Sequence, residues 1–82
     1  MQAVLVIWHE AHSGSESWIN IKDLDNDPAV VETIGFILPT AEGGKPGHIT
    51  IFQSRNEDFL DHVLHIPQRM VQRIVAIPTI SD

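Results

Sequence analysis

The side chains best suited to chemistry in this sequence are five histidines, four of which form two pairs spaced three residues apart. These pairs are His9 with His12, and His62 with His65. On a strand, residues three apart point to opposite faces, so neither pair is a ready chelate, although on a helix either could be. Because the chain has no cysteine, a metal site would have to combine histidine with carboxylates, for example His62 and His65 with Asp61. We therefore expect structural or solvent-exposed histidines, and we predict no metal and no cofactor.

The sequence contains no arrangement typical of an enzyme active site. The serines within residues 13–17 lie near His12, but there is no Gly-x-Ser-x-Gly elbow, and a serine-rich loop is the simpler interpretation. The glycine-rich segment 41–47 contains Lys45, but no Ser or Thr follows it, so the segment predicts a hairpin loop and not a phosphate loop. We predict that the protein is not an enzyme.

Positive charge is scarce, and this narrows any anion-binding site to a few residues. Lys and Arg total 5 against 11 Asp and Glu, which gives a formal net charge of −6. Guanidinium groups hold phosphate or carboxylate in bidentate geometry. Trp18 follows a polar loop, where an indole could stack on a ligand or cap the core. The candidate ligand-binding residues are Trp18, Arg55, Gln68, Arg69 and Arg73. The alternative is that these arginines are scattered, solvated charges.

Length and charge also limit the class of protein. The acidic balance argues against a generic nucleic-acid binder, which normally has a basic face. The 82 residues allow one domain, residues 1–82, and so small a core predicts homo-oligomerisation. The apolar run Ala3–Trp8 is too short to cross a membrane and has no basic segment before it. We therefore expect a cytoplasmic protein that does not contact a membrane.

The apolar residues indicate a sheet. Ile and Val together number 18, whereas Leu and Ala number 10, and β-branched side chains favour strands. Ala3–Trp8 is continuously apolar, which predicts a strand that is buried on both faces or is central in a small barrel. Gly35, in the middle of the second strand, predicts a bend or bulge in a tightly curved sheet. Strands are predicted at residues 3–8, 29–38, 48–53, 62–66 and 70–77, with the second and third forming a hairpin.

Three segments are ambiguous between strand and helix. Residues 18–24 place apolar side chains three apart, which favours one or two turns of helix. Residues 56–61 predict a loop or helical turn before the fourth strand. Residues 70–77 fit a strand, but a helix beginning at Pro67 also matches their spacing. We favour the strand at residues 70–77.

The C-terminal pattern resembles a known family of small barrels. Residues 63–67, two polar residues and residues 70–74 resemble the last two strands of SH3-like and Sm-like β-barrels, with a one-turn corner between them. Residues 34–38 and 49–51 resemble the glycine-containing central hairpin of that family. The resemblance covers about residues 29–77 and implies a mainly β fold, a five-stranded SH3-like/Sm-like small barrel with one short helical segment.

The resemblance does not extend to the residues with which Sm-like proteins bind RNA. Those proteins have Asp and Asn in the central hairpin loop and a basic or glycine-containing pair at the last corner. Here the loop runs from Glu42 to Gly47, and the corner reads Pro67-Gln68-Arg69. A fold can be shared without its function.

The whole chain also resembles small phage-encoded proteins of undefined function, through Trp18, Gly35-Phe36 and Ile66-Pro67. This implies a non-catalytic phage-like binding protein, an anti-defence protein among the possibilities. It would sequester a small anionic ligand of the nucleotide type, or inhibit a host or defence protein in the host cytoplasm. The alternatives are an Sm-like RNA-binding oligomer and a structural protein–protein interaction module.

Overall fold

The computed structural model describes residues 2–10, 18, 20–23 and 28–78. Within these residues the chain forms strands and three single turns of 3-10 helix. The strands are β1 (Ala3–Glu10), β2 (Ala29–Leu38), β3 (His48–Phe52), β4 (Ser54–Asn56), β5 (Phe59–Asp61), β6 (Leu64–Pro67) and β7 (Val71–Ala76). The 3-10 turns are η1 (Ile21–Asp23), η2 (Thr40–Glu42) and η3 (Gln68–Met70). No helix in these described ranges has the length and apolarity needed to cross a membrane.

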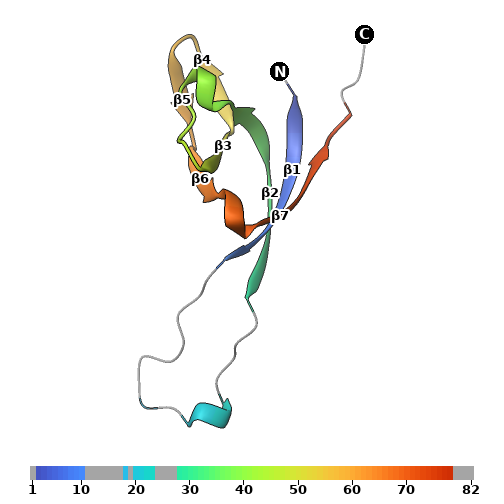
Figure 1. Cartoon of the computed structure of the whole chain (residues 1–82). Helices are drawn as coiled ribbons and strands as arrows, with labels where there is room; N and C mark the ends of the chain where they lie inside the picture. The colour runs from blue at the N-terminus through green and yellow to red at the C-terminus, as the bar shows by residue number, and fades with distance from the viewer. Residues whose placement is uncertain (1, 11–17, 19, 24–27, 79–82) are drawn as a thin grey trace.

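Five strands form one antiparallel sheet in the order β6-β3-β2-β1-β7, and β4 and β5 pair with each other in a separate hairpin (Figure 1). The predicted mainly β fold is confirmed. A closed barrel is not found: β6 and β7 occupy opposite edges of the sheet. Among the described residues β6 pairs only with β3, and β7 pairs only with β1. Both edges therefore keep unpaired backbone groups.

Most of the predicted strands are confirmed. The second strand has the predicted bounds 29–38, and residues 71–76 of the predicted segment 70–77 form strand β7 and not a helix. Met70 belongs to the preceding turn η3. The interpretation of residues 56–61 as a loop or helical turn is wrong, because this segment contributes to the β4–β5 hairpin. The predicted fourth strand, 62–66, is β6, and it begins two residues later than expected. The helical segment predicted at 18–24 is the single turn η1, and residues 19 and 24–27 lie outside the described residues.

Gly35 lies where β2 packs closely against the end of β3. An added Cβ at this position would lie 2.5 Å from Cγ2 of Ile51 and 2.8 Å from the carbonyl oxygen of Phe52. The side-chain amide of Gln53 donates a hydrogen bond to the carbonyl oxygen of Ile34 at the same place. Only glycine permits so close an approach of side chain and backbone. The requirement for glycine at this position therefore has a direct steric cause, whereas the bend or bulge predicted here stays a prediction.

The core lies on the inner side of this curved sheet and is small. Val4, Val6 and Trp8 point inward from β1 and pack with Ile51 and Ile66. The indole N–H of Trp8 donates a 3.0 Å hydrogen bond to the hydroxyl of Thr33. Only six apolar side chains are buried among the described residues, so a single copy of the chain buries little of its apolar surface.

The β4–β5 turn holds a non-glycine residue in the left-handed region. Glu57 has φ 53° between the paired residues Asn56 and Phe59. An L-residue there costs about 1–2 kcal/mol, which glycine avoids. We expect Glu57→Gly to raise the free energy of unfolding by about 0.5–1 kcal/mol, net of glycine's extra freedom in the unfolded chain, in urea denaturation. Asp58→Gly is the matched control and should not stabilise; equal effects of the two changes would contradict the explanation.

Candidate functional site

The described residues form an open, mainly apolar cleft at one end of the sheet. The cleft has a volume of about 500 Å³, within the range of small-molecule sites. Its walls come from the start of β1, the end of β2 with the following turn, the end of β3, and β4. The lining residues are Gln2, Val4, Ile37, Leu38, Pro39, Glu42, Phe52 and Arg55. Apolar side chains thus form most of the wall, and the charged groups are one guanidinium and one carboxylate.

Arg55 is the cation of this cleft. It also lines an adjoining cleft of about 310 Å³ with Leu38, Glu42 and Asp58, so its side chain lies between the two. Its Nε donates a 3.1 Å hydrogen bond to the carbonyl oxygen of Glu57. Among the described residues the only ion pair joins Asp61 and His62. No described carboxylate therefore pairs with Arg55, and the terminal N–H groups of its guanidinium can bind an anion.

The structure distributes the sequence-predicted ligand residues over several elements. Arg55 is on β4, Gln68 and Arg69 are on η3, and Arg73 is on β7. Trp18 is fully exposed and lies three residues before η1, which is beyond the far end of the β1–β2 hairpin in Figure 1. Arg55 alone of the five lines the 500 Å³ cleft. The other four residues do not contribute to this cleft.

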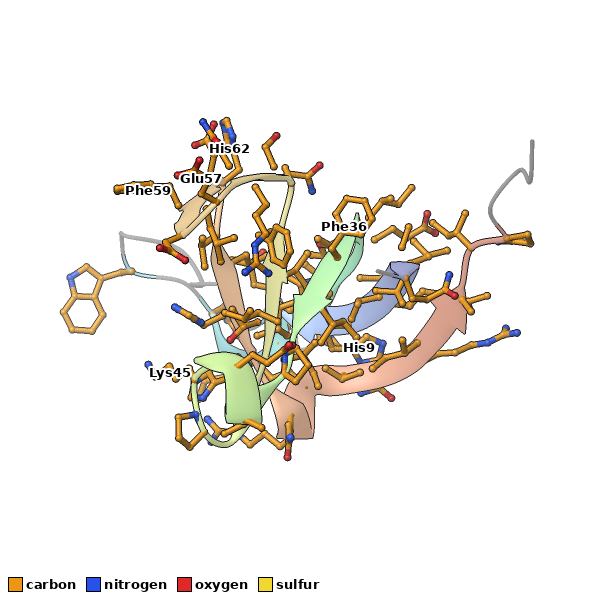
Figure 2. The ribbon with its side chains drawn as sticks, turned by 90° about the horizontal axis from the view of Figure 1, so that it is seen from above. His9, Phe36, Lys45, Glu57, Phe59 and His62 are labelled. Atoms are coloured by element: carbon orange, nitrogen blue, oxygen red, sulfur yellow. The ribbon has the colours of Figure 1, made fainter. Side chains whose placement is uncertain are left out.

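The histidines do not assemble a metal centre among the residues that are described. His62 forms a 3.1 Å ion pair with Asp61, and Figure 2 shows His62 on the β4–β5 side of the molecule, near Glu57 and Phe59. His65 instead shares a 2.9 Å hydrogen bond with the hydroxyl of buried Thr50. In the described ranges no three His, Asp or Glu side chains lie close enough to hold a metal ion. His12 lies outside those ranges.

A second feature is the side of the β7-β1-β2 sheet that faces away from the core. Directly paired residues on neighbouring antiparallel strands share a face, and the pairing places one set of apolar side chains together here. Ile34 is 57% exposed and Val30 is 63% exposed. We call this surface the outer face; its apolar residues are Leu5, Ile7, Val30, Ile34, Phe36 and Val75.

Comparisons of the chain with protein-family models, with curated proteins and with solved structures found no match. Function is therefore inferred from the geometry of this chain. Sequence patterns missed most of the cleft residues, such as Gln2, Leu38 and Phe52, because these residues are not unusual in type. The outer face has a sequence signature: both alternating sets of residues in Ala3–Trp8 are apolar, which indicates a strand with two faces to cover.

Proposed function

We propose that this chain is a non-catalytic binding protein that holds a small anionic ligand with an apolar part in the Arg55 cleft. The observation that carries the proposal is a guanidinium without a described carboxylate partner, placed in the wall of a mainly apolar cleft. A phosphate or carboxylate would bind Arg55 in bidentate geometry. The apolar part of the ligand would contact Leu38 and Pro39, which line the cleft.

Nucleotides fit this description and define the first ligand class to test. The anionic phosphate would reach Arg55, and the base would pack against the apolar wall. Glu42 lies on the same cleft wall, where it can accept a hydrogen bond from an exocyclic amino group of a base. This arrangement keeps the sequestering function that the phage-like resemblance implies. The RNA-binding alternative has less support, because the candidate arginines occupy β4, η3 and β7 instead of one rim.

We further propose that the sheet belongs to the SH3-like/Sm-like barrel type. Two observations support this: the strand order β6-β3-β2-β1-β7, and the single 3-10 turn η3 that joins the last two strands. The β4–β5 hairpin is then an insertion between the third and fourth strands of the main sheet. The resemblance concerns fold type only, since function does not follow from fold.

A thermal-shift assay with adenine and guanine mono-, di- and cyclic nucleotides tests the ligand proposal. A nucleotide at about 100 times its Kd should stabilise the protein by about 2.7 kcal/mol, which raises Tm by about 11–22 °C in a domain of this size. Arg55→Gln should abolish the shift. Arg69→Gln, outside the cleft, is the control and should retain it. If no nucleotide raises Tm, or if Arg55→Gln responds like the wild type, the proposal is wrong.

A further inference from the structure

The outer face is a surface that a single copy of the chain leaves uncovered. We propose that a second copy covers it, so that the protein is a homodimer with two sheets packed face to face about a two-fold axis parallel to β1. This inference does not depend on which ligand occupies the Arg55 cleft. The exposed apolar area of the outer face, the placement of its charges and the matching of its apolar side chains each support a second copy as its occupant.

The outer face keeps apolar area exposed in a single copy. Val30 is 63% exposed and Ile34 is 57% exposed, and Leu5, Ile7 and Val75 are only half-buried. A standard stable interface hides about 800 Å² on each partner. A facing copy would remove this apolar area from water, which favours association.

The strand register sets out the outer face in rows across three strands. One row is Ile34 on β2, Leu5 on β1 and Val75 on β7. A two-fold axis parallel to β1 exchanges the β2 and β7 positions, so Ile34 of each copy lies over the partner's Val75. Leu5 then lies over the partner's Leu5. Aligned sheets pack about 10 Å apart through such contacts, and every apolar residue of this row meets an apolar residue.

The next row of the outer face carries two opposite charges. Their placement determines how the two copies are oriented relative to each other. Glu32 on β2 and Arg73 on β7 flank Ile7 on β1, and no ion pair joins the two charges within one described chain. The same axis places Glu32 of each copy over the partner's Arg73. An axis perpendicular to the strands keeps β2 over β2 and β7 over β7, so it never places Glu32 over Arg73; when it passes through this row it opposes like charges, which repulsion disfavours. Only the axis parallel to β1 therefore pairs the opposite charges.

The amino-acid sequence of β1 supports the same conclusion. Ala3–Trp8 is apolar at every position, the pattern of a strand buried on both faces. In one copy the inward side chains Val4, Val6 and Trp8 are buried, while Leu5 and Ile7 are only half-buried. A facing sheet from a second copy would bury both sides of β1. This provides the double burial that the sequence predicts and that a single copy lacks.

Charge reversal at the two facing positions tests the dimer without altering its core. Glu32 and Arg73 are both exposed, so each can be changed in the folded protein. Sedimentation equilibrium of the wild type should give twice the chain mass at micromolar concentration. Glu32→Arg alone and Arg73→Glu alone should each raise the dimer Kd about tenfold or more, because each places like charges opposite one another. The double variant Glu32→Arg with Arg73→Glu should recover the wild-type Kd to within about threefold.

A contact that does not pair Glu32 with the partner's Arg73 would not regain its wild-type Kd in the double variant. Ile34→Lys should also abolish the dimer, whereas Ile21→Lys, on η1 and 83% exposed, is the matched control and should leave it intact. A monomeric wild type at micromolar concentration overturns the proposal. A dimer that is indifferent to both charge reversals overturns it too, because association would then occur elsewhere, for example through the free edges of β6 or β7. Circular dichroism of each variant confirms that the sheet is folded.

Discussion

Trp8→Ala should lower the free energy of unfolding by about 3–5 kcal/mol. Trp8 is 8% exposed and packs in the small inner core with Val4, Val6, Ile51 and Ile66. So few other buried residues surround it that little neighbouring structure can collapse into the cavity. The total stability expected for a domain of this length is about 4–12 kcal/mol. We therefore expect Trp8→Ala to lose at least about a quarter of the total stability and to unfold at a lower urea concentration than the wild type, as measured by far-UV circular dichroism.

A milder change separates the packing of Trp8 from its hydrogen bond. Trp8→Phe keeps an aromatic ring but removes the indole N–H that donates to the hydroxyl of Thr33 at 3.0 Å. A double-mutant cycle with Thr33→Val should give a coupling free energy of about 0.5–1.5 kcal/mol for this bond. Trp18→Ala is the control, because Trp18 is fully exposed, and its effect should stay within about 0.5 kcal/mol. If Trp18→Ala lowered the free energy of unfolding as much as Trp8→Ala, the assignment of Trp8 to the core and of Trp18 to the surface would be wrong.

Gly35→Ala should lower the free energy of unfolding by about 1–3 kcal/mol. The new methyl group would lie 2.5 Å from Cγ2 of Ile51 and 2.8 Å from the carbonyl oxygen of Phe52, so β2 and β3 would have to separate at this position. The loss should appear in urea denaturation. Amide chemical shifts near Ile51 should also change.

A second glycine provides the comparison for Gly35. Gly47 has φ 71°, and an added Cβ there would meet nothing within 4 Å. Gly47→Ala should therefore cost about 1 kcal/mol from backbone strain alone and leave the amide shifts of β2 unchanged. If Gly35→Ala is as stable as the wild type, the close approach of β2 and β3 is not what requires glycine at this position.

The sequence predicted strands well where the apolar pattern was long and regular. Ala29–Leu38 is one such strand, with bounds that match the structure to the residue. The failure at residues 56–61 has a physical reason: Asn56 and Asp58 favour both helix starts and tight turns. Glu57 then adopts a positive φ of 53°, which is uncommon for its residue type. Local composition alone could not distinguish the two structures.

The candidate site was less predictable than the fold. Arginines were selected by their chemistry, but residues 55, 69 and 73 lie on three different elements, and sequence spacing does not show which one borders a cleft. The outer face was closer to being predictable. The unbroken apolar run of β1 indicated two faces to cover, but the register that aligns Glu32 and Arg73 beside Ile7 requires the three-dimensional pairing of β1, β2 and β7.

The most direct test of the dimer is an isotope-filtered NOE spectrum of a sample that mixes ¹³C-labelled and unlabelled chains, because it detects only contacts between copies. Intermolecular NOEs are predicted between the methyl groups of Ile34 and Val75, and between the two copies of Leu5, whose positions the strand register assigns to the outer face. Ile66, fully buried in the inner core, should show none. A spectrum without intermolecular NOEs at concentrations where the dimer is expected, or with NOEs confined to β6 or to the far edge of β7, would contradict the face-to-face assembly.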